Sequence, residues 1–201
     1  MKTVLIFVRH GETEVNTEKK LHKDNDPNEL NNVGKEQIQE AGEKIKSYKP
    51  DVIYSSKEKR ALQSAEIISM ICGVEFKIVD GLQERNWGDL SGSTWLEIQV
   101  VLDKMTFDER FNYIPPNGES WKKFDARLRS KLVEIVKNHK GRTVVIVTHG
   151  GAIRALIPYL LDVSKEESFK YDPNNASLSI FEHDGNKFFK KTVNDTSHLG
   201  K

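Results

Sequence analysis

Short apolar runs, each rich in β-branched residues, alternate along the chain with longer segments of helical periodicity. The runs lie at residues 4–8, 51–54, 76–79 and 144–147. Runs of this length and composition are typical of buried strands. Three other segments place apolar residues three or four positions apart, which predicts helices: Ile38, Ala41, Ile45 and Tyr48; Ala61, Ala65, Ile68 and Cys72; and Trp121, Phe124, Leu128, Leu132 and Ile135. Strands alternating with helices predict an α/β fold whose sheet is covered on both faces.

The remaining segments carry weaker signals. Ser55 or Ser56 is expected to cap the helix that follows 51–54. Further elements are expected as a helix over 95–105, a helix from Gly151 limited by Pro158, and a terminal hairpin of 177–182 with 187–193. Loops are expected at 16–32 and 81–92, and a frayed tail at 195–201.

The bulk composition narrows the class of protein. The chain has 201 residues without a repeat or a linker, so we expect a single domain over residues 1–201. Its formal net charge of +1 excludes the broad basic surface of a nucleic-acid-binding protein. The first apolar run is too short for a signal peptide or a membrane span, which predicts a cytoplasmic protein. Cys72, the only cysteine, can form no internal disulfide and is expected to be an inert buried thiol.

Two of the predicted strands end in a histidine followed by glycine. Arg9-His10-Gly11 follows the run at 4–8, and Thr148-His149-Gly150-Gly151 follows the run at 144–147. Ligands of open parallel sheets bind beyond the carboxyl ends of the strands, so both imidazoles are expected in one pocket. Taken alone, His10 would more often be a structural histidine. Two histidines at equivalent strand ends, beside Arg9, favour a cationic functional site.

This set of residues suits phosphoryl transfer. A neutral imidazole can attack phosphorus when a backbone carbonyl fixes its Nδ1–H and leaves Nε2 free, and a sharp turn at Gly11 permits that approach. The transferring phosphoryl group also needs positive charge around its oxygens, which Arg9, Arg60 and His149 can supply. Arg60 is expected at the start of a helix, where an anion is favoured.

Three further positions complete the predicted pocket. Asn16 is a short neutral donor in the loop after His10, and the N–H groups of Gly150 and Gly151 at a helix start are expected to face the phosphate. Glu84, in the loop after 76–79, is the candidate general acid for the leaving alkoxide.

The alternative interpretation is a metal site made of His10, His149 and Glu84. Two arginines would repel a cation there, so we expect neither a metal nor another cofactor. Weaker candidates are His22 as a pocket residue and Trp87 as a substrate contact. Trp95 and Trp121 are expected to pack, and residues 57–59 to form a solvated helix start.

The same residues resemble the motifs of the histidine phosphatase (phosphoglycerate mutase-like) superfamily. Arg9-His10-Gly11-Glu12-Thr13 with Asn16 resembles its RHG motif, and five further segments follow in order: 30–37, Ser55-Ser56 with Arg60-Ala61 and Ser64-Ala65, Leu82-Gln83-Glu84 with Gly88 and Gly92, 116–120, and 147–151. The resemblance implies a three-layer α/β/α sandwich and a phosphohistidine intermediate. It implies that His10 is the nucleophile, that Glu84 is the proton donor, and that Arg9, Asn16, Arg60 and His149 clamp the phosphate.

We therefore interpret the chain as a phosphomonoester hydrolase whose partner is a small phosphorylated metabolite. A cofactor-dependent phosphoglycerate mutase is the closest alternative, because Glu84-Arg85-Asn86-Trp87-Gly88 resembles the E-R-x-x-G form of mutases and sugar bisphosphatases. Against it, residues 93–118 contain only Lys104 and Arg110 as basic groups for a substrate carboxylate. A non-catalytic phospho-ligand binding module would need neither His10 nor Glu84. Sugar phosphates, phosphoserine and nucleotide-like phosphates such as α-ribazole phosphate stay open as substrates, as does the oligomeric state.

Overall fold

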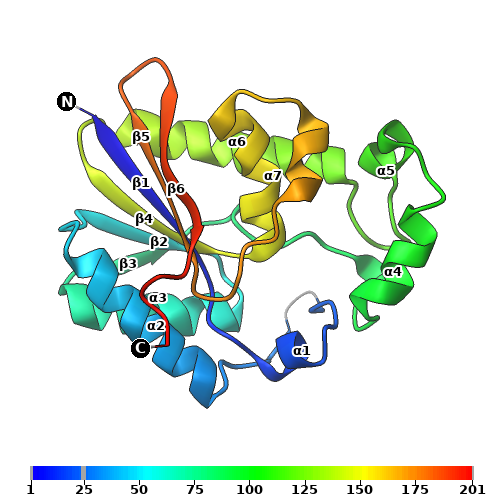
Figure 1. Ribbon diagram of the computed structural model, residues 1–201, viewed down its shortest axis with the longest axis horizontal. Helices are drawn as coiled ribbons and strands as arrows, with labels where there is room; N and C mark the ends of the chain where they lie inside the picture. The colour runs from blue at the N-terminus through cyan, green and yellow to red at the C-terminus, as the bar shows by residue number, and fades with distance from the viewer. Residues whose placement is uncertain (1, 24–25, 201) are drawn as a thin grey trace.

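A twisted sheet of six strands forms the centre of the molecule in the computed structural model (Figure 1). The structure describes residues 2–23 and 26–200. Residues 1, 24, 25 and 201, which belong to the predicted domain, the predicted 16–32 loop and the predicted tail, lie outside the described residues. Among the residues that the structure describes, no helix has the length and apolar character needed to cross a bilayer.

The strands run in the order β3-β2-β4-β1-β5-β6 across the sheet. Their bounds are Thr3–Arg9 for β1, Val52–Ser55 for β2, Phe76–Ile78 for β3, Thr143–Thr148 for β4, Leu178–His183 for β5 and Phe188–Asp195 for β6. The first four strands pair in parallel, whereas β5 is antiparallel to both β1 and β6. The parallel strands and the terminal hairpin predicted from the sequence are thus confirmed.

Two pairs of helices cover the two faces of this sheet. Helices α2 (Asn32–Lys46) and α3 (Lys59–Cys72) lie on one face, and α6 (Trp121–Asn138) and α7 (Gly150–Leu161) lie on the other (Figure 1). Because side chains alternate along a strand, Val144 and Ile146 of β4 enter the core beside α6 and α7, whereas Val145 and Val147 enter the core beside α2 and α3. The three-layer α/β/α sandwich is therefore confirmed.

The region between β3 and α6 forms two short helices where one was predicted. Helix α4 spans Trp95–Leu102, and α5 spans Phe107–Asn112. The prediction over 95–105 was too long because Thr106 starts a new helix, accepting a hydrogen bond from the backbone N–H of Glu109. A similar capping box at Thr13 starts α1 (Glu14–Thr17), so a short helix precedes the predicted loop and includes its first two residues.

Two other sequence predictions were wrong. Neither Ser55 nor Ser56 caps α3, since Glu58 occupies its N-cap position. The tail is not frayed over the described residues 195–200: Asp195 ends β6, the His198 ring lies 3.1 Å from the carbonyl oxygen of Ala176, and Leu199 packs on the core beside α2. Both errors come from tertiary contacts that local sequence does not encode.

The turn after β1 packs closely against the start of α2. A Cβ on Gly34 would lie 2.1 Å from the carbonyl oxygen of Glu12, and a Cβ on Gly11 would lie 2.3 Å from the carbonyl oxygen of Gly34. These two glycines let the backbones touch, and they thereby fix where the chain turns after His10. The position of the first histidine thus depends on the absence of two side chains.

We predict that Gly34→Ala lowers the free energy of unfolding by about 1–3 kcal/mol, the usual effect of overpacking a close contact. Helix propensity alone would change the stability in the opposite direction. Chemical denaturation measures the difference, with Lys35→Ala on the exposed face of α2 as the control. A Gly34→Ala protein as stable as the wild type would contradict the importance of this contact.

Candidate active site

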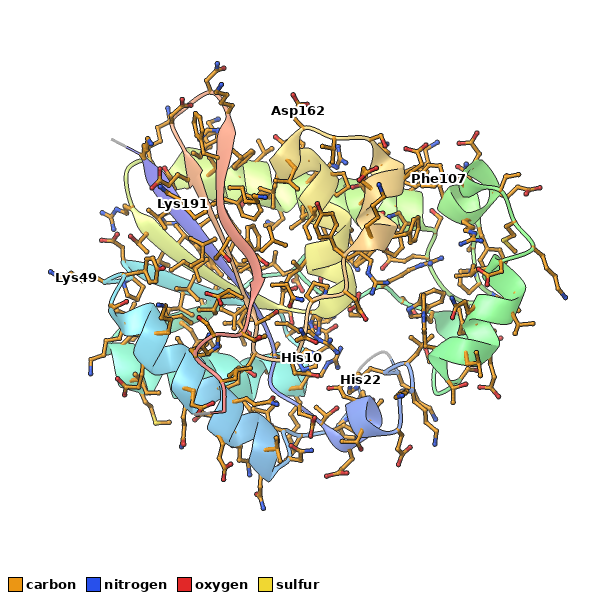
Figure 2. All side chains as sticks on the ribbon, viewed as in Figure 1. His10, His22, Lys49, Phe107, Asp162 and Lys191 are labelled. Carbon is orange, nitrogen blue, oxygen red and sulfur yellow. The ribbon has the colours of Figure 1, made fainter. Side chains whose placement is uncertain are left out.

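A cavity of about 380 Å³ opens beyond the carboxyl ends of the parallel strands, and His10, Arg9 and Arg60 line it. His10 follows β1 and His149 follows β4, and their ring centroids lie 5.2 Å apart. Figure 2 shows His10 at the end of the sheet, facing the loop that carries His22. Both histidines are buried, with His149 fully enclosed beneath the cavity. The expected meeting of the two imidazoles is therefore present in the structure.

The contacts of His10 define its protonation state. Its Nδ1 lies 2.7 Å from the carbonyl oxygen of Gly11, and a carbonyl only accepts, so Nδ1 carries the proton. Its Nε2 accepts a hydrogen bond from Nε of Arg60 at 3.2 Å. Burial, followed by the charge of Arg60, lowers the pKa of His10 well below its ordinary value. His10 is thus a neutral imidazole with a lone pair on Nε2.

Three nitrogen atoms of residues that neighbour His10 are buried without a hydrogen-bond partner in the described part of the chain. They are Nε of Arg9, Nη1 of Arg60 and Nδ1 of His149. Burial lowers the pKa of both arginines from its ordinary value, which reflects charge held away from water. Buried polar groups of native proteins are nearly always paired, so the two guanidinium nitrogens, which only donate, indicate a site built for an anion.

Asn16 is held beside His10 by a residue that the sequence analysis missed. Asn175, in the segment before β5, donates from Nδ2 to the carbonyl oxygen of His10 at 3.1 Å and to Oδ1 of Asn16 at 3.1 Å. Because Oδ1 of Asn16 also accepts from Thr13, the amide group of Asn16 is oriented with its Nδ2 toward His22. No local motif marks Asn175, which lies 165 positions from His10 along the chain.

His22, a weak candidate in the sequence, does line the cavity. Its ring lies edge-on to that of His10 with centroids 5.8 Å apart (Figure 2). Its Nδ1 lies 3.0 Å from Oδ2 of Asp26. Burial and the charge of Arg60 nevertheless lower the pKa of His22 to about 3. The ring is therefore neutral, with Nε2 available as an acceptor toward Thr13 and Asn16.

Glu84 reaches the same cavity from the loop after β3, as expected. Its two carboxylate oxygens accept hydrogen bonds at 2.8 Å from the backbone N–H groups of Gly151 and Arg85. The Gly151 N–H is thus engaged by Glu84, and the prediction that it faces a phosphate was wrong. Gly150 lines the cavity, and a Cβ there would lie 3.2 Å from Nε of Arg9. The start of α7 therefore lies close to both Glu84 and Arg9.

Glu58 is the main feature that the sequence analysis misinterpreted. Lys57 and Lys59 are exposed as expected of a solvated helix start, but Glu58 between them is only 7% exposed. Its Oε2 lies 3.0 Å from Nε2 of His149, and its Oε1 accepts from the backbone N–H of Glu84 at 3.0 Å. The available sequence signal was the position of Glu58, two residues before Arg60 at the start of the same helix.

The outer part of the cavity is aromatic and basic. Trp87, Trp95 and Trp121 all line it, including the two that were expected only to pack. The basic side chains there are Arg154 of α7, Lys19 and Lys20 of the segment after α1, and Arg85, which follows Glu84 in the loop after β3. Neither basic residue of the 93–118 segment lines the cavity.

These features define a class of protein: an α/β/α sandwich with a buried neutral histidine inside a cationic anion site at the ends of its parallel strands. Residues 5–196 match the histidine phosphatase superfamily (branch 1), and the chain belongs to this family.

Relatives and solved structures resemble the chain over nearly its whole length. It is 36% identical to phosphoglycerate mutase-like protein 4 of Arabidopsis thaliana, with 97% of this chain and 86% of the relative covered. It is 32% identical to the metal-independent phosphoserine phosphatase of the same plant, covering 98% and 83%. The structure of Bacillus stearothermophilus YhfR matches with a TM-score of 0.86 at 30% identity, covering 98% and 100%. A mutant phosphoserine phosphatase from Entamoeba histolytica, in complex with phosphoserine, matches with a TM-score of 0.83 at 28% identity, covering 98% and 99%.

We predict that Gly151→Ala lowers kcat on the order of 10²-fold, because it displaces Glu84, the candidate general acid, from its position in the cavity. The new Cβ would lie 2.3 Å from Oε1 of Glu84, which has to move, whereas alanine suits the helix itself. Steady-state kinetics and inhibition by inorganic phosphate measure the two effects. Unchanged kcat, or a loss of phosphate binding as large as the loss of kcat, would contradict a selective displacement of Glu84.

Proposed function

We propose that the protein is a metal-independent phosphatase that hydrolyses a small phosphomonoester through a phosphohistidine at His10. The observation that carries the proposal is that the guanidinium groups of Arg9 and Arg60, next to the neutral His10, each have a buried N–H donor without a partner among the described residues. Phosphoryl oxygens would supply the missing acceptors. Charge-assisted hydrogen bonds from these groups would stabilise the transition state more than the bound substrate.

In the first half-reaction, the lone pair on Nε2 of His10 attacks phosphorus. The bond from phosphorus to the ester oxygen breaks as the nitrogen–phosphorus bond forms, and Glu84 donates a proton to the leaving oxygen. Nε of Arg60 donates to this lone pair, and the attack on phosphorus breaks that hydrogen bond and frees the guanidinium to bind the phosphoryl group. The Nδ1–H bond to the carbonyl oxygen of Gly11 stabilises the positive charge that His10 acquires.

In the second half-reaction, the Glu84 carboxylate accepts a proton from water as that water attacks phosphorus. The nitrogen–phosphorus bond breaks, inorganic phosphate leaves, and His10 returns to its neutral form. One carboxyl group thus serves both steps, first as an acid and then as a base. The same role for Glu84 argues against a non-catalytic binding module, which would not need a proton donor.

Two observations bear on the substrate. The cavity extends beyond the phosphate site and is lined by three tryptophans, so the alcohol part of the substrate is expected to contact them. Phosphoserine, the ligand of one solved relative, is one candidate. Lys19, Lys20 and Arg154 also line the cavity, and these basic groups favour phosphoglycerate mutase activity as the second candidate function. The cytoplasmic location stays a prediction.

We predict that the wild-type protein releases inorganic phosphate from phosphomonoesters in the presence of EDTA and that His10→Ala abolishes this turnover. A panel that includes phosphoserine, sugar phosphates and α-ribazole phosphate identifies the preferred alcohol, with isomerisation of 3-phosphoglycerate assayed in parallel. Isomerisation that exceeds phosphate release would favour the mutase. Turnover by His10→Ala, or activity that EDTA removes and a divalent metal restores, would overturn the proposal.

We predict that the effect of Glu84→Gln depends on the leaving group. With an alkyl phosphate, phosphorylation of His10 should slow roughly 10²–10⁴-fold, the range for a positioned general acid. With p-nitrophenyl phosphate that step should slow far less, because the phenolate leaves without a proton. A burst of p-nitrophenol followed by slow turnover is therefore expected in rapid-mixing measurements. An equal loss with both substrates and no burst would mean that Glu84 is structural.

A further inference from the structure

Glu58 lies beneath the anion site and touches two parts of it. Its carboxylate oxygens contact Nε2 of His149 and the backbone N–H of Glu84, each at 3.0 Å. Nε2 of His149 also lies 2.7 Å from Oγ of Ser56. One buried side chain therefore links the end of β4, which carries a clamp residue, to the loop that carries the acid.

Helix capping does not explain this arrangement. Glu58 occupies the N-cap position of α3, but its side chain makes no capping hydrogen bond to that helix. Burial alone would raise the pKa of Glu58, yet the neighbouring His149 and Arg60 and the hydrogen bonds from His149 and Ser56 together hold it below its usual range. The carboxylate is thus ionised and buried, and such a charge needs a partner.

The contact with Glu58 restricts how His149 can bind a phosphoryl group. A carboxylate only accepts hydrogen bonds, so Nε2 of His149 carries a proton. Nδ1 of the same ring is buried without a partner in the described structure. Since the oxygens of an ionised phosphoryl group also only accept, Nδ1 needs a proton to bind them. Both ring nitrogens are protonated only in the imidazolium ion.

We propose that Glu58 is a positioning residue that makes His149 bind the phosphoryl group as an imidazolium ion and holds the Glu84 loop in register with it. The proposal rests on the phosphatase function proposed above. A carboxylate that orients a histidine and stabilises its positive charge is an arrangement known from other catalytic sites.

The charges around His149 explain why a dedicated anion is needed. The end of β1 contributes Arg9 and His10, α3 contributes Arg60, and the segment after α1 contributes His22, all cationic or neutral. The Glu84 carboxylate belongs to the loop after β3 and accepts a hydrogen bond from the backbone N–H of Gly151 in α7. Glu58 is the carboxylate that touches the His149 ring among the described residues.

Glu58→Gln tests this inference because it keeps the shape of the side chain and removes the charge. Its single amide oxygen can accept from Glu84 or from His149 but not from both. The imidazolium form should become less stable, so the alkaline limb of the kcat/KM profile moves to lower pH by about one unit or more. At neutral pH, kcat should fall roughly 10- to 100-fold. Glu66→Gln, the same change at an exposed position of α3, is the matched control and should leave the limb in place.

A merely structural role would lower activity by the same factor at every pH, and an unmoved limb would overturn the proposal. The same substrate is used throughout, so its own ionisation is common to all variants. A measurement on the wild type covers the case in which Glu58→Gln does not fold. In ¹⁵N-histidine spectra with bound vanadate, both nitrogens of His149 should be protonated, and a single protonated nitrogen would contradict the proposal. His10→Ala separates the role of Glu58 from the proposed phosphatase function. Its loss of turnover supports the phosphatase function even if the alkaline limb of the kcat/KM profile stays in place in Glu58→Gln.

Discussion

In the parallel pairing of β1 with β4, Arg9 lies opposite Thr148, so the next residues of both strands, His10 and His149, leave the sheet side by side. This register is fixed by the apolar residues of the two strands, which enter cores on both faces of the sheet. A shift by one residue would exchange the two faces of a strand. The hydrophobic core therefore determines the distance between His10 and His149.

The positive groups that lie close together in the site impose a second constraint on the structure, besides the register of β1 and β4. The guanidinium groups of Arg9 and Arg60 are withdrawn from water, and burial lowers the pKa of both. Two carboxyl groups lie beside this charge: the buried Glu58 in contact with His149, and the half-buried Glu84, which accepts a hydrogen bond from the start of α7. The remaining donors lack a partner among the described residues. In the proposed mechanism, these preorganised groups bind the phosphoryl oxygens and need little rearrangement during the reaction.

The sequence predicted the parts of the site that follow strong strands. Arg9, His10 and His149 come directly after apolar runs, and the glycines beside them indicate sharp turns. Residue types together with these positions were sufficient to predict a cationic pocket with Glu84 as the candidate acid, and resemblance to a known family implied the same role for Glu84.

The parts that the sequence did not predict depend on contacts between distant segments. Glu58 stands between two lysines and has the local pattern of a solvated residue, but its partner His149 lies 91 positions away. Asn175 is likewise placed by the return of the chain before β5. The 198–199 segment was expected to fray because its apolar contact, Leu199, is isolated in sequence and finds the core only in the folded protein.

The atom that carries the phosphate in the intermediate shows directly whether Nε2 of His10 is the nucleophile. The Nδ1–H bond to the carbonyl oxygen of Gly11 leaves only Nε2 as a nucleophile. Wild-type protein is mixed with substrate, quenched in alkali during turnover and analysed by ³¹P–¹H correlation NMR, which distinguishes the two phosphohistidine isomers, with peptide mapping to locate the residue. We expect phosphate on Nε2 of His10. Phosphate on Nδ1 of His10, or on His149, would contradict it.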